Sequence, residues 1–190
     1  ADEYTVENVA RVSLATAKCV KQNFDNPSIV IGHDCRFAGD LFMRTAAKVF
    51  VSEGVNVKMA EGFVSTPMVS LGAVKLGCSL GVVITASHNP PSYNGFKLKS
   101  HQGEPLSPGK VQEIEDIILD TNTIDLEAVS LDSKLVEWID LETMYVDHAK
   151  ANFDLKAIED SGLVLAYDAM YGAGQNALKR LLPNTKFLPL

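Results

Sequence analysis

A serine, a histidine and a lysine lie near one another in a stretch that cannot form a helix. Ser87 and His88 follow the apolar, β-branched run at 82–84, and two consecutive prolines occupy 90–91. Each proline fixes its own φ and moves the residue before it out of the helical region. We therefore expect a stiff loop at the end of a strand. It would present a hydroxyl, an imidazole and, further on, the ammonium of Lys97.

Groups of this kind suit phosphoryl chemistry. A free serine hydroxyl is a weak nucleophile and needs a neighbouring base. A phosphoserine carries about two negative charges, which a cation such as Lys97 would stabilise. Adjacent side chains of an extended segment point to opposite faces, so we expect His88 to bind substrate or support the loop rather than to deprotonate Ser87 directly. The alternative is a proline-stiffened hairpin that exposes a serine without chemistry.

The same stretch carries a family resemblance. Thr-Ala-Ser-His-Asn-Pro at 85–90, followed by Tyr-Asn-Gly-Phe-Lys at 93–97, resembles the phosphoserine loop of the α-D-phosphohexomutases, the phosphoglucomutases and phosphomannomutases. The resemblance implies that Ser87 passes a phosphoryl group to a hexose phosphate and takes one back, with a hexose 1,6-bisphosphate as intermediate. It also implies that Lys97 lies in the active site and that Mg²⁺ binds the phosphoryl oxygen on Ser87.

Two further residues are candidates for binding phosphate or substrate. The segment His-Asp-Cys-Arg at 33–36 resembles a first-domain segment of the family. The Arg36 guanidinium either contacts the serine loop or a substrate oxyanion, or it forms only a local salt link with Asp34 that shapes the loop. Asn89 lies inside the matched loop and is predicted to bind phosphate or substrate. No role is assigned to His33.

A glycine pattern near the end of the chain leaves other functions open. Residues 172–177 fit the dinucleotide-binding pattern Gly-x-Gly-x-x-Ala after a predicted strand. A nucleotide-binding fragment is therefore one alternative, and a non-catalytic module that binds phosphate or a phosphosugar is another. Residues 167–172 instead resemble the opening strand and turn of the mutase second domain, which assigns the glycines to a tight turn and helix packing. The histidines show no zinc-binding spacing.

Alternating strands and helices must position these residues. Apolar runs and helical spacing predict helices near 6–24, 41–54, 66–77, 111–118, 138–153 and 175–182, and strands near 29–32, 55–59, 82–84, 96–98 and 163–167. Asp40 is expected to cap the second helix. The alternation predicts an α/β fold, a layered mixed sheet with helices on both faces, followed by the beginning of a second α/β domain.

The predicted domains are a phosphoserine-bearing unit at 1–153 and the incomplete start of a second unit at 154–190. Binding loops gather at the carboxyl ends of strands in such folds. This rule places residues 33–39, 62–66 and 87–94 at one edge of the sheet.

The amino-acid composition limits the kinds of binding partner and the cellular compartment that we expect for the protein. The chain has 190 residues, of which 46% are hydrophobic and 22% charged, as in ordinary globular proteins. Its net charge of −7 argues against a nucleic-acid or anionic-membrane surface. No apolar run is long enough to cross a bilayer. The three cysteines lack Cys-x-x-Cys spacing, which fits a reducing, cytoplasmic compartment.

The resemblance covers only the front of a typical family member. The family's metal-binding Asp-x-Asp-x-Asp loop and its third and fourth domains have no counterpart in these residues. We therefore expect an N-terminal portion of a mutase, with little turnover by itself. Tyr93 and Phe96 resemble the glucose and mannose enzymes more than the glucosamine branch.

Overall fold

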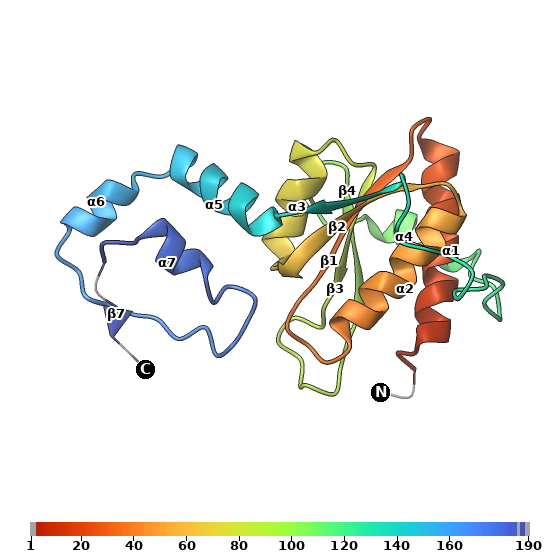
Figure 1. The fold of residues 1–190 in the computed structure, drawn as a ribbon, viewed down its shortest axis with the longest axis horizontal. Helices are drawn as coiled ribbons and strands as arrows, with labels where there is room; N and C mark the ends of the chain where they lie inside the picture. Colours follow the sequence, from red (N-terminus) through yellow and green to blue (C-terminus); the bar gives the residue numbers. More distant parts are fainter. Residues whose placement is uncertain (1–2, 186, 189–190) are drawn as a thin grey trace.

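A five-stranded sheet covered by helices on both faces forms the larger part of the structure, a computed structural model that describes residues 3–185 and 187–188 (Figure 1). The helices are α1 (Val6–Asn23), α2 (Gly39–Ser52), α3 (Thr66–Lys75), α4 (Pro108–Glu115), α5 (Leu141–Asn152), α6 (Leu155–Asp160) and α7 (Ala177–Leu181). The strands are β1 (Ser28–His33), β2 (Asn56–Phe63), β3 (Leu80–Ile84), β4 (Phe96–Ser100), β5 (Val136–Ile139), β6 (Leu165–Ala166) and β7 (Phe187–Leu188).

The two faces of the sheet have separate cores. Ile29 and Ile31 of β1 pack in one cluster with residues of α1 and α2. Val30, between them, packs in another cluster with Val69 of α3 and Leu141 of α5. Successive side chains of a strand point to opposite faces, so a continuous apolar strand requires cover on both sides. This confirms the predicted layered α/β architecture.

The strand order is β4-β3-β1-β2-β5, and only β4 runs antiparallel to its neighbour. Ile84 pairs with Phe96 and Val83 with Lys97, so the chain does return beside the strand that leads into the serine loop. The sheet is therefore mixed, as predicted. Because β1, β2 and β3 are parallel, their carboxyl ends lie at a common edge.

The predicted helix from 138 to 153 was wrong at its start. Residues 136–139 form strand β5, in which Trp138 pairs with Met59 of β2. The helix begins at Leu141, after Asp140, whose carboxylate accepts a hydrogen bond of 2.8 Å from the backbone N–H of Thr143. The apolar residues have helical spacing, but pairing with β2 makes 136–139 a strand, and the cap at Asp140 starts the helix after it.

The cap predicted at Asp40 was also wrong. Helix α2 begins at Gly39, and Ala38 occupies the cap position with φ of 59° and no capping side chain. Asp40 lies in the first turn, where it pairs with Arg44 at 2.8 Å. Helix α4 ends at Glu115 rather than near 118, and β2 extends to Phe63.

Beyond α5, the chain forms a smaller unit that lies to one side of the large sheet (Figure 1). Strands β6 and β7 are parallel and are connected through α7. This strand–helix–strand arrangement is how an α/β unit begins. Arg180 of α7 donates hydrogen bonds of 2.7 Å to Glu142 and to Thr143 of α5. The domain boundary between 153 and 154 stays a prediction.

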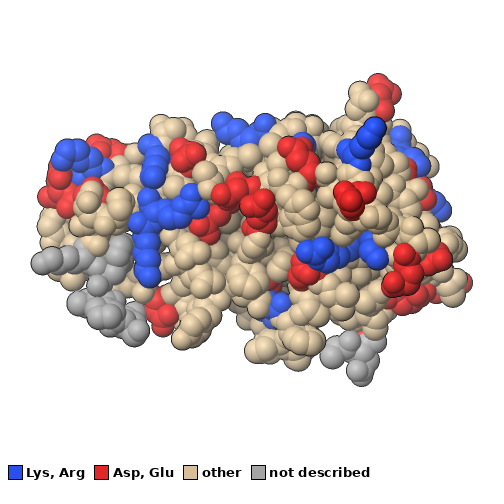
Figure 2. Space-filling view, in the orientation of Figure 1, with Lys and Arg blue, Asp and Glu red and all other residues tan. Residues whose placement is uncertain are grey.

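Charges of both signs are interspersed on the face drawn in Figure 2, without a continuous basic field. In the described part of the chain, no helix is both long and apolar enough to cross a membrane. Cys19, Cys35 and Cys78 are free thiols.

Candidate active site

The loops at the common edge of the sheet enclose a cleft of about 550 Å³ that contains Ser87. Its lining comes from the segments after β1, β2 and β3 and from the turn after β6: Asp34, Cys35, Arg36, Phe37, Val64, Ser65, Thr66, Thr85, Ser87, Asn89, Pro91, Met170, Tyr171, Gly172 and Ala173. The sequence prediction that three loops meet at one edge is thus confirmed.

The serine loop is a tight excursion between β3 and β4. Thr85 N–H donates to the carbonyl of Gly95 at 3.0 Å and closes the loop at its base. Ser87 is exposed at the start of the loop, with φ of 56°. A left-handed conformation costs a residue with a Cβ about 1–2 kcal/mol. Its neighbours must therefore hold the Ser87 backbone in place.

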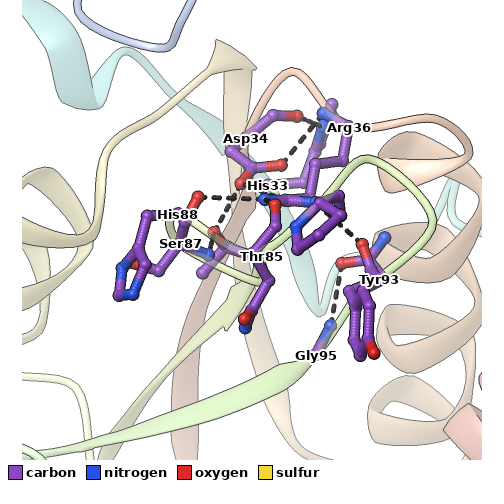
Figure 3. Close-up of polar contacts among 11 residues, drawn as sticks. His33, Asp34, Arg36, Thr85, Ser87, His88, Tyr93 and Gly95 are labelled. Carbon is purple, nitrogen blue, oxygen red and sulfur yellow. Dashed lines mark hydrogen bonds and ion pairs between the residues drawn. The ribbon is translucent and has the colours of Figure 1, made fainter.

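Arg36 supplies much of that restraint. Its guanidinium reaches across from the segment after β1 and donates to four loop carbonyls (Figure 3). The acceptors are the carbonyls of Ser87 at 3.0 Å, Asn89 at 2.6 Å, Pro90 at 2.8 Å and Tyr93 at 2.9 Å. A planar fork of fixed donors is suited to such a set of acceptors.

The remaining donor of Arg36 faces a carboxylate. Nε lies 3.5 Å from Asp34 Oδ2, and the Arg36 backbone N–H donates to Asp34 Oδ1 at 3.0 Å. Arg36 therefore contacts the serine loop and also pairs with Asp34, so the alternative of a local salt link alone is wrong. With its donors directed at these acceptors, the guanidinium shapes the loop. A contact between Arg36 and a substrate oxyanion stays a prediction.

Asp34 also organises the end of β3. The hydroxyl of Thr85, which is buried, donates to Asp34 Oδ2 and accepts the backbone N–H of Ser87 at 3.0 Å. Burial, and to a lesser extent the negative charge of Asp34, raise the pKa of the Tyr4 hydroxyl. Asp34 Oδ2 thus faces both the Thr85 hydroxyl and the guanidinium of Arg36.

His88 lies nearer to the serine hydroxyl than the sequence suggested. Its Nδ1 is 3.3 Å from Ser87 Oγ (Figure 3). The expectation of opposite faces assumed an extended backbone, whereas φ of 56° at Ser87 turns the two side chains toward each other. The imidazole is thus within reach of the serine proton.

The other two predicted site residues differ in position. Asn89 lines the cleft, while its backbone N–H donates to the carbonyl of Ala86 at 3.0 Å. Lys97 is exposed on β4 and is not among the residues that line the cleft. Burial, and then the positive charge of Lys97, lower the pKa of Lys99.

Sequence reasoning assigned no site role to Met170 and Tyr171, which lie in the turn after β6, or to Thr85. Met170 and Tyr171 have φ of 47° and 58°, and both line the cleft. Consecutive left-handed residues other than glycine are uncommon and concentrate at functional sites. The strand-end rule could have found this turn, because it follows a predicted strand of the second unit.

The glycine pattern at 172–177 serves packing in the described structure. A Cβ on Gly172 would lie 2.9 Å from the carbonyl oxygen of Ala169, and one on Gly174 would lie 3.2 Å from the Tyr167 hydroxyl. That hydroxyl donates to the carbonyl of Gly174 at 2.8 Å. These close approaches agree with the tight-turn interpretation.

The described residues do not form a complete metal site. Residues 3–185 and 187–188 contain no group of three or more His, Cys, Asp or Glu side chains that could hold an ion. Asp34, the carboxylate of the cleft, is engaged by Arg36 and Thr85. Binding of Mg²⁺ through a phosphoryl oxygen on Ser87 therefore stays a prediction.

Comparisons with known proteins agree with this geometry. Residues 1–125 match the model of the family described as phosphoglucomutase/phosphomannomutase, alpha/beta/alpha domain I. A phosphoglucomutase of Staphylococcus haemolyticus is 31% identical over 98% of this chain and 34% of its own length. A phosphoglucosamine mutase of Alkaliphilus metalliredigens is 31% identical over 95% of this chain and 40% of its own length.

A solved structure from Thermus thermophilus, of a protein assigned as a phosphomannomutase, superposes with a TM-score of 0.87. It is 29% identical, and the match covers 100% of this chain and 43% of that one. The chain thus spans less than half the length of these relatives. Both the family model and the superposition include the sheet edge that carries the serine loop. The chain therefore belongs to the phosphoglucomutase/phosphomannomutase family, the α-D-phosphohexomutases.

Proposed function

We propose that the native protein is a phosphohexomutase that moves a phosphoryl group between C1 and C6 of a hexose phosphate. A phosphoserine at Ser87 and a hexose 1,6-bisphosphate are its intermediates. The observation that carries the proposal is an exposed serine hydroxyl in a cleft, on a backbone that Arg36 and Thr85 hold in a costly conformation. Family membership supplies the reaction class.

The proposed chemistry balances at Ser87. When the bisphosphate reacts, a bond between phosphorus and a sugar oxygen breaks, and a bond between phosphorus and Ser87 Oγ forms. The serine proton passes to His88 Nδ1, which lies 3.3 Å from Oγ. The departing sugar oxygen takes up a proton, for which Lys97 is the candidate donor. Transfer back to the other hydroxyl of the sugar gives the isomer.

Asn89 is proposed to bind the substrate or its phosphate from the cleft wall. Mg²⁺, bound through the phosphoryl oxygen on Ser87, is the proposed cofactor and would neutralise charge on the transferred group. The described residues contain no group of three or more His, Cys, Asp or Glu side chains that could supply the remaining ligands. A cytoplasmic location stays a prediction that the free thiols support.

A panel of sugar phosphates tests the function. The native protein is incubated with the 1-phosphates of glucose, mannose and glucosamine, and formation of each 6-phosphate is followed. We expect turnover of at least one sugar, and loss of that turnover in Ser87→Ala. Ser92→Ala is the matched control, because Ser92 is exposed in the same loop but is not among the cleft residues.

Turnover that survives Ser87→Ala would contradict the proposal. Binding of a hexose phosphate without turnover would instead identify a phosphosugar-binding module. Preference for glucose or mannose over glucosamine would bear out the prediction based on Tyr93 and Phe96.

A further inference from the structure

Thr85 lies between the serine loop and the carboxylate of Asp34. It directly follows β3, and the residue is 4% exposed. Its hydroxyl makes two hydrogen bonds, one to Asp34 Oδ2 and one from the Ser87 N–H at 3.0 Å (Figure 3). The Thr85 hydroxyl donates to the carboxylate, so its proton points at Asp34. The lone pairs of the hydroxyl are thereby turned toward Ser87.

Both backbone polar groups of Ser87 are thus held by side chains. Thr85 accepts its N–H, and Arg36 donates to its carbonyl at 3.0 Å. Thr85 and Arg36 in turn contact the same carboxylate, since Arg36 Nε lies 3.5 Å from Asp34 Oδ2. The carboxylate of Asp34 therefore sets the positions of Thr85 and Arg36, the two side chains that hold the backbone of Ser87.

The restraint acts on a residue whose backbone conformation is unfavourable. Ser87 has φ of 56°, and this angle brings Oγ within 3.3 Å of His88 Nδ1. If the N–H of Ser87 lost its acceptor, the residue could relax toward negative φ. The hydroxyl would then move away from the imidazole.

We propose that Thr85 is a positioning residue for phosphoryl transfer: its hydroxyl, oriented by Asp34, fixes the left-handed backbone of Ser87 and so sets the direction of Oγ. This inference rests on the proposed function. It gives a role to Thr85, which takes no part in the proposed steps at Ser87. It implies that the loop is already formed before any phosphoryl group arrives, because the contacts come from the protein itself. Misplacement of a reacting group by about 1 Å can cost about 100-fold in rate.

The test compares Thr85→Val with Thr85→Ser. Valine keeps the shape and burial of threonine but removes both hydrogen bonds, whereas serine keeps the hydroxyl. In the native protein, transfer from hexose 1,6-bisphosphate to Ser87 is measured by mass in single-turnover experiments at several concentrations. We expect the limiting rate of Thr85→Val to fall by about 10- to 100-fold with little change in half-saturating concentration. Thr85→Ser should stay within about threefold of the parent.

Amide exchange separates positioning from the proposed function. In this chain without substrate, the Ser87 N–H of Thr85→Val should exchange with solvent at least about tenfold faster than in the parent, while Thr85→Ser should match the parent. Equal exchange in all three proteins would overturn the inference, as would a normal limiting rate in Thr85→Val. If the parent accepts no phosphoryl group but Thr85→Val exchanges faster, the proposed function fails and the restraint on Ser87 stands.

Discussion

Replacement of Arg36 by methionine should destabilise the chain much more than the same replacement of Arg44. Hydrogen bonds to charged groups contribute about 1.5–3 kcal/mol each, and Arg36 makes four to the loop. The carbonyls belong to exposed residues, so water replaces part of this loss. The change also leaves Asp34, whose side chain is only 18% exposed, without its cation. We expect the free energy of unfolding to fall by about 3 kcal/mol.

Urea unfolding followed by circular dichroism measures this difference. For a chain of this length, a loss of about 3 kcal/mol corresponds to a melting temperature lower by about 6–12 °C. Arg44 forms an ion pair with Asp40 in which the side chains are 46% and 55% exposed, so Arg44→Met should cost about 1 kcal/mol or less. Equal losses in the two variants would refute the view that Arg36 restrains the loop.

Lysine at position 36 distinguishes a role for the planar donors of Arg36 from a role for its charge alone. Lysine keeps the charge but cannot present a planar set of donors to several carbonyls. Arg36→Lys should therefore lose most of the stability that Arg36→Met loses. A lysine variant with parental stability would contradict this and favour a role for the charge alone.

Three further outcomes concern the base of the loop, helix α4 and the cap of α5. Gly95→Ala should cost about 1–3 kcal/mol in urea unfolding, because its Cβ would lie 2.8 Å from the carbonyl oxygen of Thr85. Gly109→Ala in α4, where a Cβ meets no neighbouring atom within 4 Å, should instead stabilise by up to about 1 kcal/mol. Asp140→Ala should cost about 1 kcal/mol at neutral pH. Hydrogen bonds from the first turn of α5 lower the pKa of Asp140. The contribution of this carboxylate is therefore complete above the ordinary carboxyl pKa and is lost as pH falls through the lowered one. The stability gap between the parent and the variant should consequently stay constant from about pH 7 to about pH 5 and shrink only as the pH falls below about 4; a gap that persists undiminished in acid would contradict the cap.

The apolar strands and the helices packed on them were predictable because burial on two faces leaves a clear pattern. The run at 29–31 is β-branched throughout and needs cover on both sides, and it became the central strand. The start of α5 was not predictable in this way. Trp138 continues the helical spacing of the apolar residues, but pairing with Met59 of β2 decides its conformation, and no local pattern reveals that partner.

In the candidate site, too, some features were predictable from the sequence and others were not. Strand ends brought the predicted loops together, because parallel strands place their carboxyl ends at one edge. The left-handed backbone of Ser87 could not be predicted, since it depends on the contacts that Arg36 and Thr85 make from other parts of the fold. For this reason the sequence placed His88 on the wrong side of the serine.

The most direct test of the central claim is the mass of the peptide that contains Ser87. The native protein is digested as purified and after incubation with a hexose 1,6-bisphosphate, and the modified residue is located by fragmentation. The account predicts one phosphoryl group on Ser87 in at least one of these samples, with removal on addition of a hexose monophosphate. An unmodified Ser87 in both samples, or a phosphoryl group that hexose monophosphate does not remove, would contradict it.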